Sequence, residues 1–225
     1  MRAKNPDIIY EDPQVIVCRK EAGVPVQTSR AGQADLVNML KNYRAKKREE
    51  PYVGLVHRLD QPVEGIMVFA KTKSAAAELS GQVRGRTMDK QYLAVVCGCM
   101  SGFRGELTDC LLRDGKTNTS AVVPEHTPGG KMAHLSYEVC RVDRERQLSL
   151  VKIMLDTGRH HQIRVQFAHA GYPLYADTKY GTPLPDGEYC PVALCSCKIG
   201  FLHPGTKKKM EFEIVPSGKG FAGMV

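Results

Sequence analysis

The 225-residue sequence contains no long apolar run and no tryptophan. A helix that crosses a bilayer needs about 18 consecutive apolar residues, so no membrane-spanning helix is predicted. The N-terminal stretch "MRAKNPDIIYEDP" has charges and a proline where a signal peptide has an apolar core. We therefore expect a cytoplasmic protein. The absence of tryptophan excludes no class of protein.

Internal repeats, low-complexity segments and an evident interdomain linker are also missing from the sequence. The hydrophobic content of 42% and the charged content of 25% are ordinary for a soluble globular protein, which argues against a disordered or fibrous class. We expect a single domain over residues 1–225.

Eight cysteines are present, but the cytosol keeps thiols reduced, so we expect no disulfide framework. Two pairs, Cys97 with Cys99 and Cys195 with Cys197, raise the alternative of a zinc site. Structural zinc motifs usually space paired cysteines by two to four residues, whereas these pairs have one residue between them. This spacing favours two small side chains on one face of a strand. We expect no metal and no cofactor.

Acidic residues are fewer than basic ones, 24 against 32, which gives a net charge of +8 and a pI near 9.1. The basic residues gather in "KNYRAKKREE", "RGRTMDKQY", "RVDRER" and "GTKKKM". Any one of these runs is also explained by solubility alone. Four such runs in one short chain favour a polyanionic partner, and nucleic acid in particular.

The hydrophobic pattern predicts an α+β fold, with a mainly antiparallel mixed sheet flanked by helices and loops. We expect Pro51 to stop the first helix, Ser74 to cap the second and Gly171 to end the third. Helices are predicted over residues 33–50, 74–85 and 160–171. Strands are predicted within 7–27, 52–59, 64–72, 90–100, 105–112, 133–143, 148–155, 191–204 and 207–216.

Reactive side chains concentrate in "HRLDQPVEG", "DKQYLAVV" and "LDTGRHHQIRVQFAHAGYPLYADTKYG". Taken singly, each has a structural explanation. Asp60 suits a turn at a strand end, Arg164 suits an exposed helix face, and Tyr92 suits an ordinary strand.

Taken together, these segments resemble the RluA family of RNA pseudouridine synthases. "GLVHRLDQPVEGIMVFAKT" is similar to its HRLD signature, and "TMDKQYLAVVCG" to its K-x-Y strand. The third segment resembles T-G-R-x-H-Q-I-R followed by G-x-P-x-x-x-D-x-x-Y-G. The resemblance runs in the family's order over nearly the whole chain and starts within its first 20 residues. We therefore expect no extra N-terminal RNA-binding domain.

The resemblance implies that Asp60 is the catalytic aspartate, Tyr92 the active-site tyrosine and Arg164 the arginine that pairs with the aspartate. Such an enzyme detaches uracil from ribose at a ring nitrogen and rejoins it at a ring carbon. A carboxylate suits this step either as a nucleophile or as a base that removes a ribose proton. A guanidinium nearby favours its ionised form, and a tyrosine ring offers a face for a flipped-out base.

An RNA surface is implied around these groups. We expect Thr157, Gly158 and Arg159 to stand where a helix begins and to bind phosphate. The structural alternative is that "TGR" is a turn and that the two histidines are exposed neighbours. The residues expected at the RNA are Arg58, His57, Lys90, Arg159, His160 and His161.

Departures from the family pattern are Val63-Glu64 after the HRLD signature and Cys195-Ser196 before the last hairpin. We expect a monomer that acts on a stem-loop of ribosomal or transfer RNA. One alternative is an RNA-binding module of the same fold without chemistry. Another is a nucleoside hydrolase or glycosidase, which would need a second acid, for which Glu64 is a candidate only by its nearness in sequence.

Overall fold

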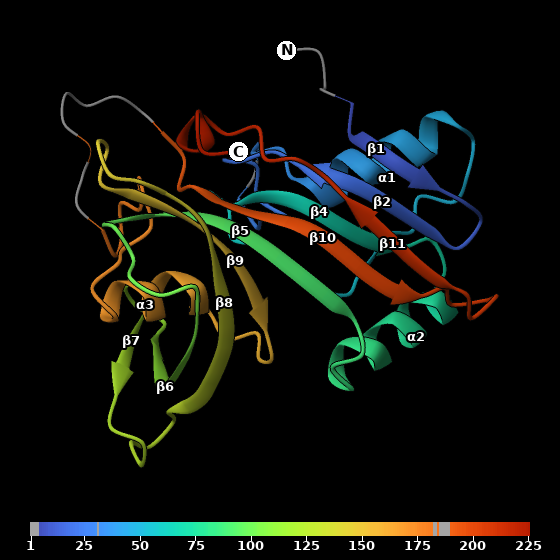
Figure 1. Cartoon of the computed structure of the whole chain (residues 1–225). Coiled ribbons are helices and arrows are strands. Elements are labelled where there is room, and N and C mark those ends of the chain that lie inside the picture. The colour runs from blue at the N-terminus through green and yellow to red at the C-terminus, as the bar shows by residue number, and fades with distance from the viewer. Residues whose placement is uncertain (1–4, 31, 182–183, 185–189) are drawn as a thin grey trace. The chain divides into compact units, whose positions relative to one another are not determined.

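The computed structural model describes residues 5–30, 32–181, 184 and 190–225. Within these residues it has eleven strands and three α-helices, which confirms the predicted α+β class (Figure 1). The chain forms two compact units, and it passes from one to the other within β5 (Asp89–Cys97), within β10 (Leu194–Leu202) and again between Ile214 and Val215. Unit 1 comprises Met1–Lys90 and Ser196–Ile214, and unit 2 comprises Gln91–Cys195 and Val215–Val225. The single domain over 1–225 stays a prediction.

The sheet of unit 1 has the strand order β1-β2-β4-β10, with β11 paired to β10 and the short β3 paired to β4. The antiparallel pair β1–β2 and the hairpin β10–β11 confirm the strands predicted near the two ends of the chain. The bounds are β1 Asp7–Glu11, β2 Val15–Lys20, β3 Gly54–Leu55, β4 Glu64–Ala70 and β11 Lys209–Glu213.

The core of unit 1 lies between β2, β4 and the helix α2 (Lys73–Arg84). Alternate side chains of the two strands, among them Val17 and Val68, pack with Leu79 of α2. The helix is capped by Thr72, whose Oγ1 accepts the amide of Ala75 at 3.1 Å. The prediction of Ser74 as the cap was therefore wrong by two residues, because the threonine already adopts extended backbone.

Helix α1 (Leu36–Lys46) begins where Asp35 accepts the amide of Asn38 at 2.8 Å. The prediction that Pro51 ends this helix was wrong. The chain leaves the helix at Lys47, and Arg48 takes the left-handed conformation with φ 60°, which stops the helix earlier.

The strand predicted over residues 52–59 is mostly absent, since only Gly54 and Leu55 pair with β4. The β-like alternation in this segment has another cause. Val53, His57 and Leu59 are buried, so the segment is held by side chains that point into the unit and not by a ladder of backbone bonds.

Unit 2 contains an antiparallel sheet of order β5-β9-β8-β6-β7. Strands β5, β6, β8 and β9 confirm the predictions, whereas β7 was missed because its run "TSAVV" is short and half polar. The bounds are β6 Arg104–Asp114, β7 Thr119–Val123, β8 Lys131–Asp143 and β9 Leu148–Leu155.

The two cysteine pairs have different settings. Cys195 and Cys197 are both buried on β10, as predicted for small side chains on one face of a strand. Cys97 is the last residue of β5, and Gly98 turns the chain with φ 103°, so the same prediction was wrong for Cys97 and Cys99.

Helix α3 (Gln162–His169) packs against β6 and β7 (Figure 1). The ring of its Phe167 meets the ring of Tyr137 edge-on, with 5.4 Å between ring centres. Gly171 follows its last turn with φ 85°, as predicted. The helix begins at Gln162, so the expectation that it starts at Thr157 to Arg159 was wrong.

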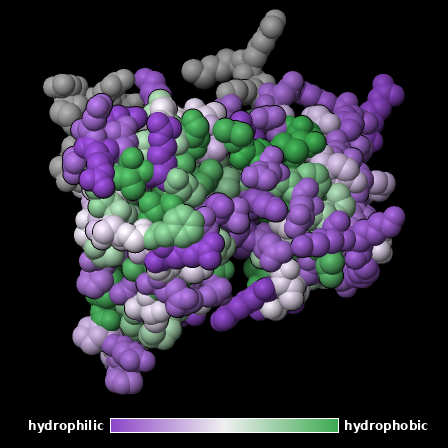
Figure 2. All heavy atoms as spheres, in the orientation of Figure 1, coloured by the Kyte–Doolittle hydropathy of each residue, from purple (hydrophilic) through white to green (hydrophobic). Residues whose placement is uncertain are grey.

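The face of the molecule in Figure 2 is largely hydrophilic, with hydrophobic residues in patches among the polar ones. Over the described ranges, none of the helices has the length and apolarity to cross a membrane.

Candidate active site

The HRLD segment of unit 1 is an extended loop whose side chains alternate between inside and outside. His57 is 8% exposed and Leu59 is 7% exposed, whereas Arg58 is exposed and Asp60 is half-buried. The two inward residues anchor the loop, and the two outward residues are the ones with chemistry to offer. The predicted placement of Asp60 outside the regular strands is confirmed.

His57 has a structural task at this position. The amide of Val68 on β4 donates to His57 Nε2 at 3.2 Å. Burial, with a smaller contribution from the charge of Lys90, lowers the pKa of His57 to about 3, so the ring is neutral and can accept this bond. The RNA contact predicted for His57 stays a prediction.

Lys20, at the end of β2, ties the same loop to its neighbours. Its ammonium is fully buried and donates to the carbonyl oxygens of Glu21, Val24 and Gln61 at 3.0, 2.7 and 3.0 Å. Burial lowers the pKa of Lys20 to about 7, against the opposing charges of Asp60 and Glu64. Because Gln61 directly follows Asp60, this lysine fixes the backbone beside the predicted catalytic carboxylate.

Glu64, part of the departure after HRLD, is 5% exposed, and its Oε2 lies 3.8 Å from Arg19 Nη2. Its carboxylate thus faces a guanidinium inside unit 1. This arrangement gives no support to a second acid that protonates a leaving group, as a glycosidase requires.

The two segments that depart from the family pattern approach each other where Gly65, next to Glu64, lies against Ser196. A Cβ atom on Gly65 would lie 2.6 Å from both the Cβ and the backbone nitrogen of Ser196, and Gly65 has φ 148°. Backbone therefore approaches backbone here, and only a small residue fits on either side.

Lys90 and Tyr92 stand two residues apart on β5, and so on the same face of that strand. Lys90 is half-buried, and burial lowers its pKa. Tyr92, in unit 2, is 7% exposed and pairs with Ile153 of β9.

Arg164 lies on α3 in unit 2 and is 3% exposed, which is not the exposed helix face that the residue alone would suggest. Its Nε and Nη2 donate to the two carboxylate oxygens of Asp177 at 2.7 and 2.6 Å. The guanidinium carbon also lies 5.2 Å from the ring centre of Tyr180. A buried arginine with a bidentate partner has a fixed orientation.

The two histidines before α3 are stacked at 3.7 Å between ring centres. His160 Nδ1 lies 2.9 Å from Ser120 Oγ, and His161 Nδ1 lies 2.6 Å from the hydroxyl of Tyr180. His161 is buried and has φ 56°, so it is not an exposed neighbour. The phosphate contacts predicted for both histidines remain predictions.

The "TGR" turn is organised by Gln162. Its Oε1 accepts the hydroxyl of Thr157 at 2.7 Å and the amide of Arg159 at 3.0 Å, and Arg159 Nε donates to the carbonyl of Met132 at 2.9 Å. The amide of Arg159 thus bonds within the turn. The alternative prediction, that "TGR" is a turn, is confirmed, and the predicted start of the helix at these residues was wrong.

Sequence reasoning missed several residues that support these groups. Asp177 and Tyr180 stand in the quoted D-x-x-Y-G motif, which could have drawn attention to them. Lys20 gave a weak signal, as a lysine that ends an apolar strand. Ser120 gave none, because it lies in the unpredicted β7.

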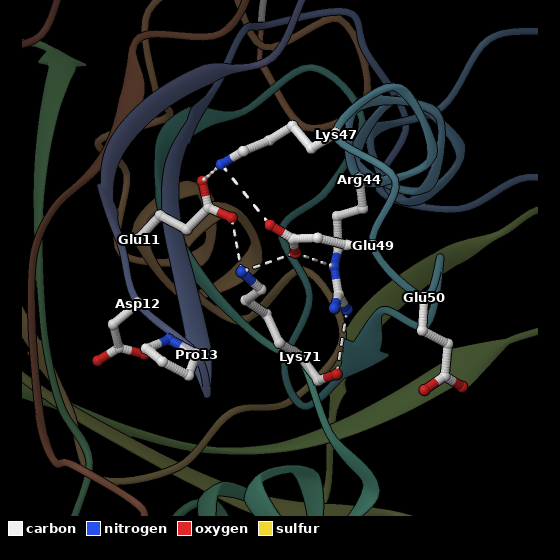
Figure 3. A pocket seen from close by; sticks show the side chains of 8 residues that line it. All are labelled: Glu11, Asp12, Pro13, Arg44, Lys47, Glu49, Glu50 and Lys71. Carbon is white, nitrogen blue, oxygen red and sulfur yellow. Dashed lines mark hydrogen bonds and ion pairs between the residues drawn. The ribbon is translucent and has the colours of Figure 1, made fainter.

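A cavity of about 580 Å³ opens elsewhere in unit 1 (Figure 3). It contains none of the predicted site residues, and ion pairs among its side chains join α1, β1 and the end of β4. Its lining is Glu11, Asp12, Pro13, Arg44, Lys47, Glu49, Glu50 and Lys71. In the part of the chain that the structure describes, no three His, Cys, Asp or Glu side chains gather as metal ligands would.

Comparison with known proteins extends the sequence resemblance. A family model described as RNA pseudouridylate synthase matches residues 14–169. An uncharacterized RNA pseudouridine synthase of Bacillus subtilis, YhcT, is 35% identical over 176 residues, which cover 78% of this chain and 57% of that relative. Ribosomal large subunit pseudouridine synthase D of Vibrio cholerae is 34% identical over 220 residues, covering 92% of this chain and 66% of the relative.

The chain thus spans less than two thirds of the length of these curated relatives. Among solved structures, human RNA pseudouridylate synthase domain containing 1 matches with a TM-score of 0.77 at 22% identity, over 96% of this chain and 85% of that one. This likeness supports the fold. With the family match over most of the sequence, it establishes that the chain belongs to the RNA pseudouridylate synthase family.

Proposed function

We propose that this protein is an RNA pseudouridine synthase that isomerises specific uridines of structured RNA. The observation that carries the proposal is the family match over residues 14–169, a range that contains the HRLD, K-x-Y and T-G-R-x-H-Q-I-R motifs. The substrate class is ribosomal or transfer RNA, and the ribosomal reading is supported by the names of several relatives. The protein acts as a cytoplasmic monomer.

In this proposal Asp60 is the reacting carboxylate. The bond from the uracil ring nitrogen to ribose breaks, the base turns, and a ring carbon forms the new bond to ribose. That carbon loses a proton and the freed nitrogen gains one, so no atom is gained or lost overall. Arg164 is the cation that supports Asp60, and Tyr92 contacts the flipped-out base. The outward position of Arg58 beside Asp60 supports a role in displacing the nucleotide.

The test maps pseudouridine in total RNA from a strain without the gene, after incubation with the purified protein. We expect the native protein to create one or a few discrete sites. Asp60→Asn should create none while it still binds RNA, because the amide can neither attack ribose nor remove its proton.

The matched control is Asp7→Asn, which removes an exposed acid from β1 of the same unit and should leave the sites unchanged. RNA binding by the native protein without any new pseudouridine would instead favour the inactive RNA-binding module. Sites that persist with Asp60→Asn would remove Asp60 from the reaction.

A further inference from the structure

Arg164 has a permanent counter-ion within its own unit. Asp177 is 0% exposed and binds the guanidinium through both of its oxygens, at 2.7 and 2.6 Å. This fork-to-fork geometry allows one relative orientation of the two planes, unlike a single contact to a flexible ammonium.

Asp177 is itself held in place from the backbone. Its Oδ1 accepts the amides of Lys179 at 2.9 Å and Tyr180 at 3.3 Å. Burial would raise the pKa of Asp177, but the bonds and charge of Arg164, with these two amides, lower it below the ordinary value. The carboxylate is therefore ionised and immobile before any substrate arrives.

Tyr180 gives the guanidinium a second neighbour, since the guanidinium carbon lies over the tyrosine ring at 5.2 Å from the ring centre. The tyrosine hydroxyl accepts the amide of Ser120 at 2.8 Å and bonds His161 Nδ1 at 2.6 Å. The loop that carries Asp177 and Tyr180 is thus fastened both to α3 and to β7, and the arginine is held by the Asp177 carboxylate and lies against the Tyr180 ring.

We propose that Asp177 is a positioning residue for the uridine isomerisation, acting by fixing the direction of the Arg164 guanidinium. The inference rests on the proposed function and adds a residue to it. Of the five N–H donors of a guanidinium, Asp177 engages one on Nε and one on Nη2, which defines the edge that remains for other partners. Without Asp177, the arginine would lose this counter-ion together with the bidentate contact that orients it.

The experiment measures kcat and KM separately on an RNA that the native protein modifies. Displacement of a catalytic group by about 1 Å costs on the order of 10²-fold in rate. We expect Asp177→Asn to lower kcat by about that factor while KM stays within about threefold. Asp177→Glu, which keeps the charge but shifts it by one methylene, should give an intermediate kcat.

The matched control is Asp109→Asn. Asp109 also bonds a side chain of α3, the amide of Gln166 at 2.8 Å, but it makes no bond to Arg164. The kcat of the Asp109→Asn variant should stay within about threefold of the native value.

Circular dichroism and thermal unfolding identify the folded variants, and if Asp177→Asn fails to fold, Asp177→Glu decides alone. A folded variant at position 177 with native kcat overturns the positioning role, and so does a loss of kcat that only follows the unfolded fraction. A native protein that makes no pseudouridine would overturn the proposed function itself, so the two failures are distinguishable.

Discussion

Glu11, on β1, is a partly buried carboxylate of unit 1 that is stabilised by two lysines. Its carboxylate bonds Lys71 at 2.7 Å and Lys47 at 2.9 Å (Figure 3). It also accepts the hydroxyl of Tyr43 at 2.8 Å. Burial alone would raise the pKa of Glu11, but these bonds lower it from 4.5 to about 2. The carboxylate is therefore charged in the folded protein under conditions where it would be neutral in the unfolded chain.

The lowered pKa of Glu11 determines how the stability of the folded protein depends on pH. The stability that Glu11 contributes is fully present above pH 4.5 and is lost as the pH falls toward about 2. We expect Glu11→Gln to lower the free energy of unfolding by about 1 to 3 kcal/mol at pH 7, because Lys71 is left buried with fewer charged partners. Denaturant titrations at pH 7, 5 and 3 should show the difference from the native protein shrinking below pH 4.5.

Glu50→Gln is the matched control, since Glu50 lines the same cavity but points away from the ion pairs in Figure 3. Its effect should be within about 0.5 kcal/mol at every pH. A pH-independent difference for Glu11→Gln would contradict the electrostatic explanation.

At the scale of elements, the close approach of β4 and β10 depends on Gly65. An added methyl group would meet Ser196 at 2.6 Å and would also strain a backbone with φ 148°. We expect Gly65→Ala to lower the free energy of unfolding by about 2 kcal/mol or more. Thermal and denaturant unfolding would measure this loss.

The comparison for this variant is Gly81→Ala. Gly81 lies inside α2, and a Cβ there would have no neighbour within 4 Å. The same chemical change should stabilise the protein by about 0.5 to 1 kcal/mol, because alanine is the better helix former. Equal effects at the two glycines would mean that the approach of the two strands does not constrain position 65.

Sequence patterns predicted the elements with strong periodicity. The apolar runs of β2, β4 and β5 and the amphipathic α1 could be located from composition and spacing alone. The end of α1 and the start of α2 could not, because the left-handed turn at Arg48 and the cap at Thr72 depend on local backbone geometry that several residue types can adopt.

The candidate site was predictable to the extent that its motifs are contiguous. Motif resemblance singled out Asp60, Tyr92 and Arg164, but it did not reveal that Arg164 is buried against Asp177. That bond joins residues whose separation in sequence gives no periodic signal. The three contacts of Lys20 are hidden for the same reason, since backbone carbonyls have no sequence signature.

At the scale of the whole molecule, the net charge of +8 should govern RNA affinity. For an RNA that the protein modifies, binding through about four phosphates would weaken roughly 10²-fold between 50 and 200 mM salt. Arg58→Gln should reduce the slope of log affinity against log salt by about one, because Arg58 is exposed beside Asp60. Filter binding or fluorescence anisotropy over a salt series would measure both.

Lys73→Gln serves as the charge-matched comparison and should keep the native slope. Lys73 is exposed, lies outside the four basic runs, and begins α2 beyond the end of β4 that is far from Asp60. A flat salt response of the native protein would rule out phosphate contacts as the main source of affinity.

The place of β10 beside β4 also bears on how the protein is made. The strands of unit 2 pair with close neighbours in sequence, as in β6–β7 and β8–β9, and such hairpins can form as the chain emerges from the ribosome. The first strands of unit 1 precede unit 2 in sequence, yet the edge of β4 that β10 covers lacks this partner until β10 has been synthesised. The sheet beside Asp60 is thus completed only after residues 91–195 of unit 2 have been made.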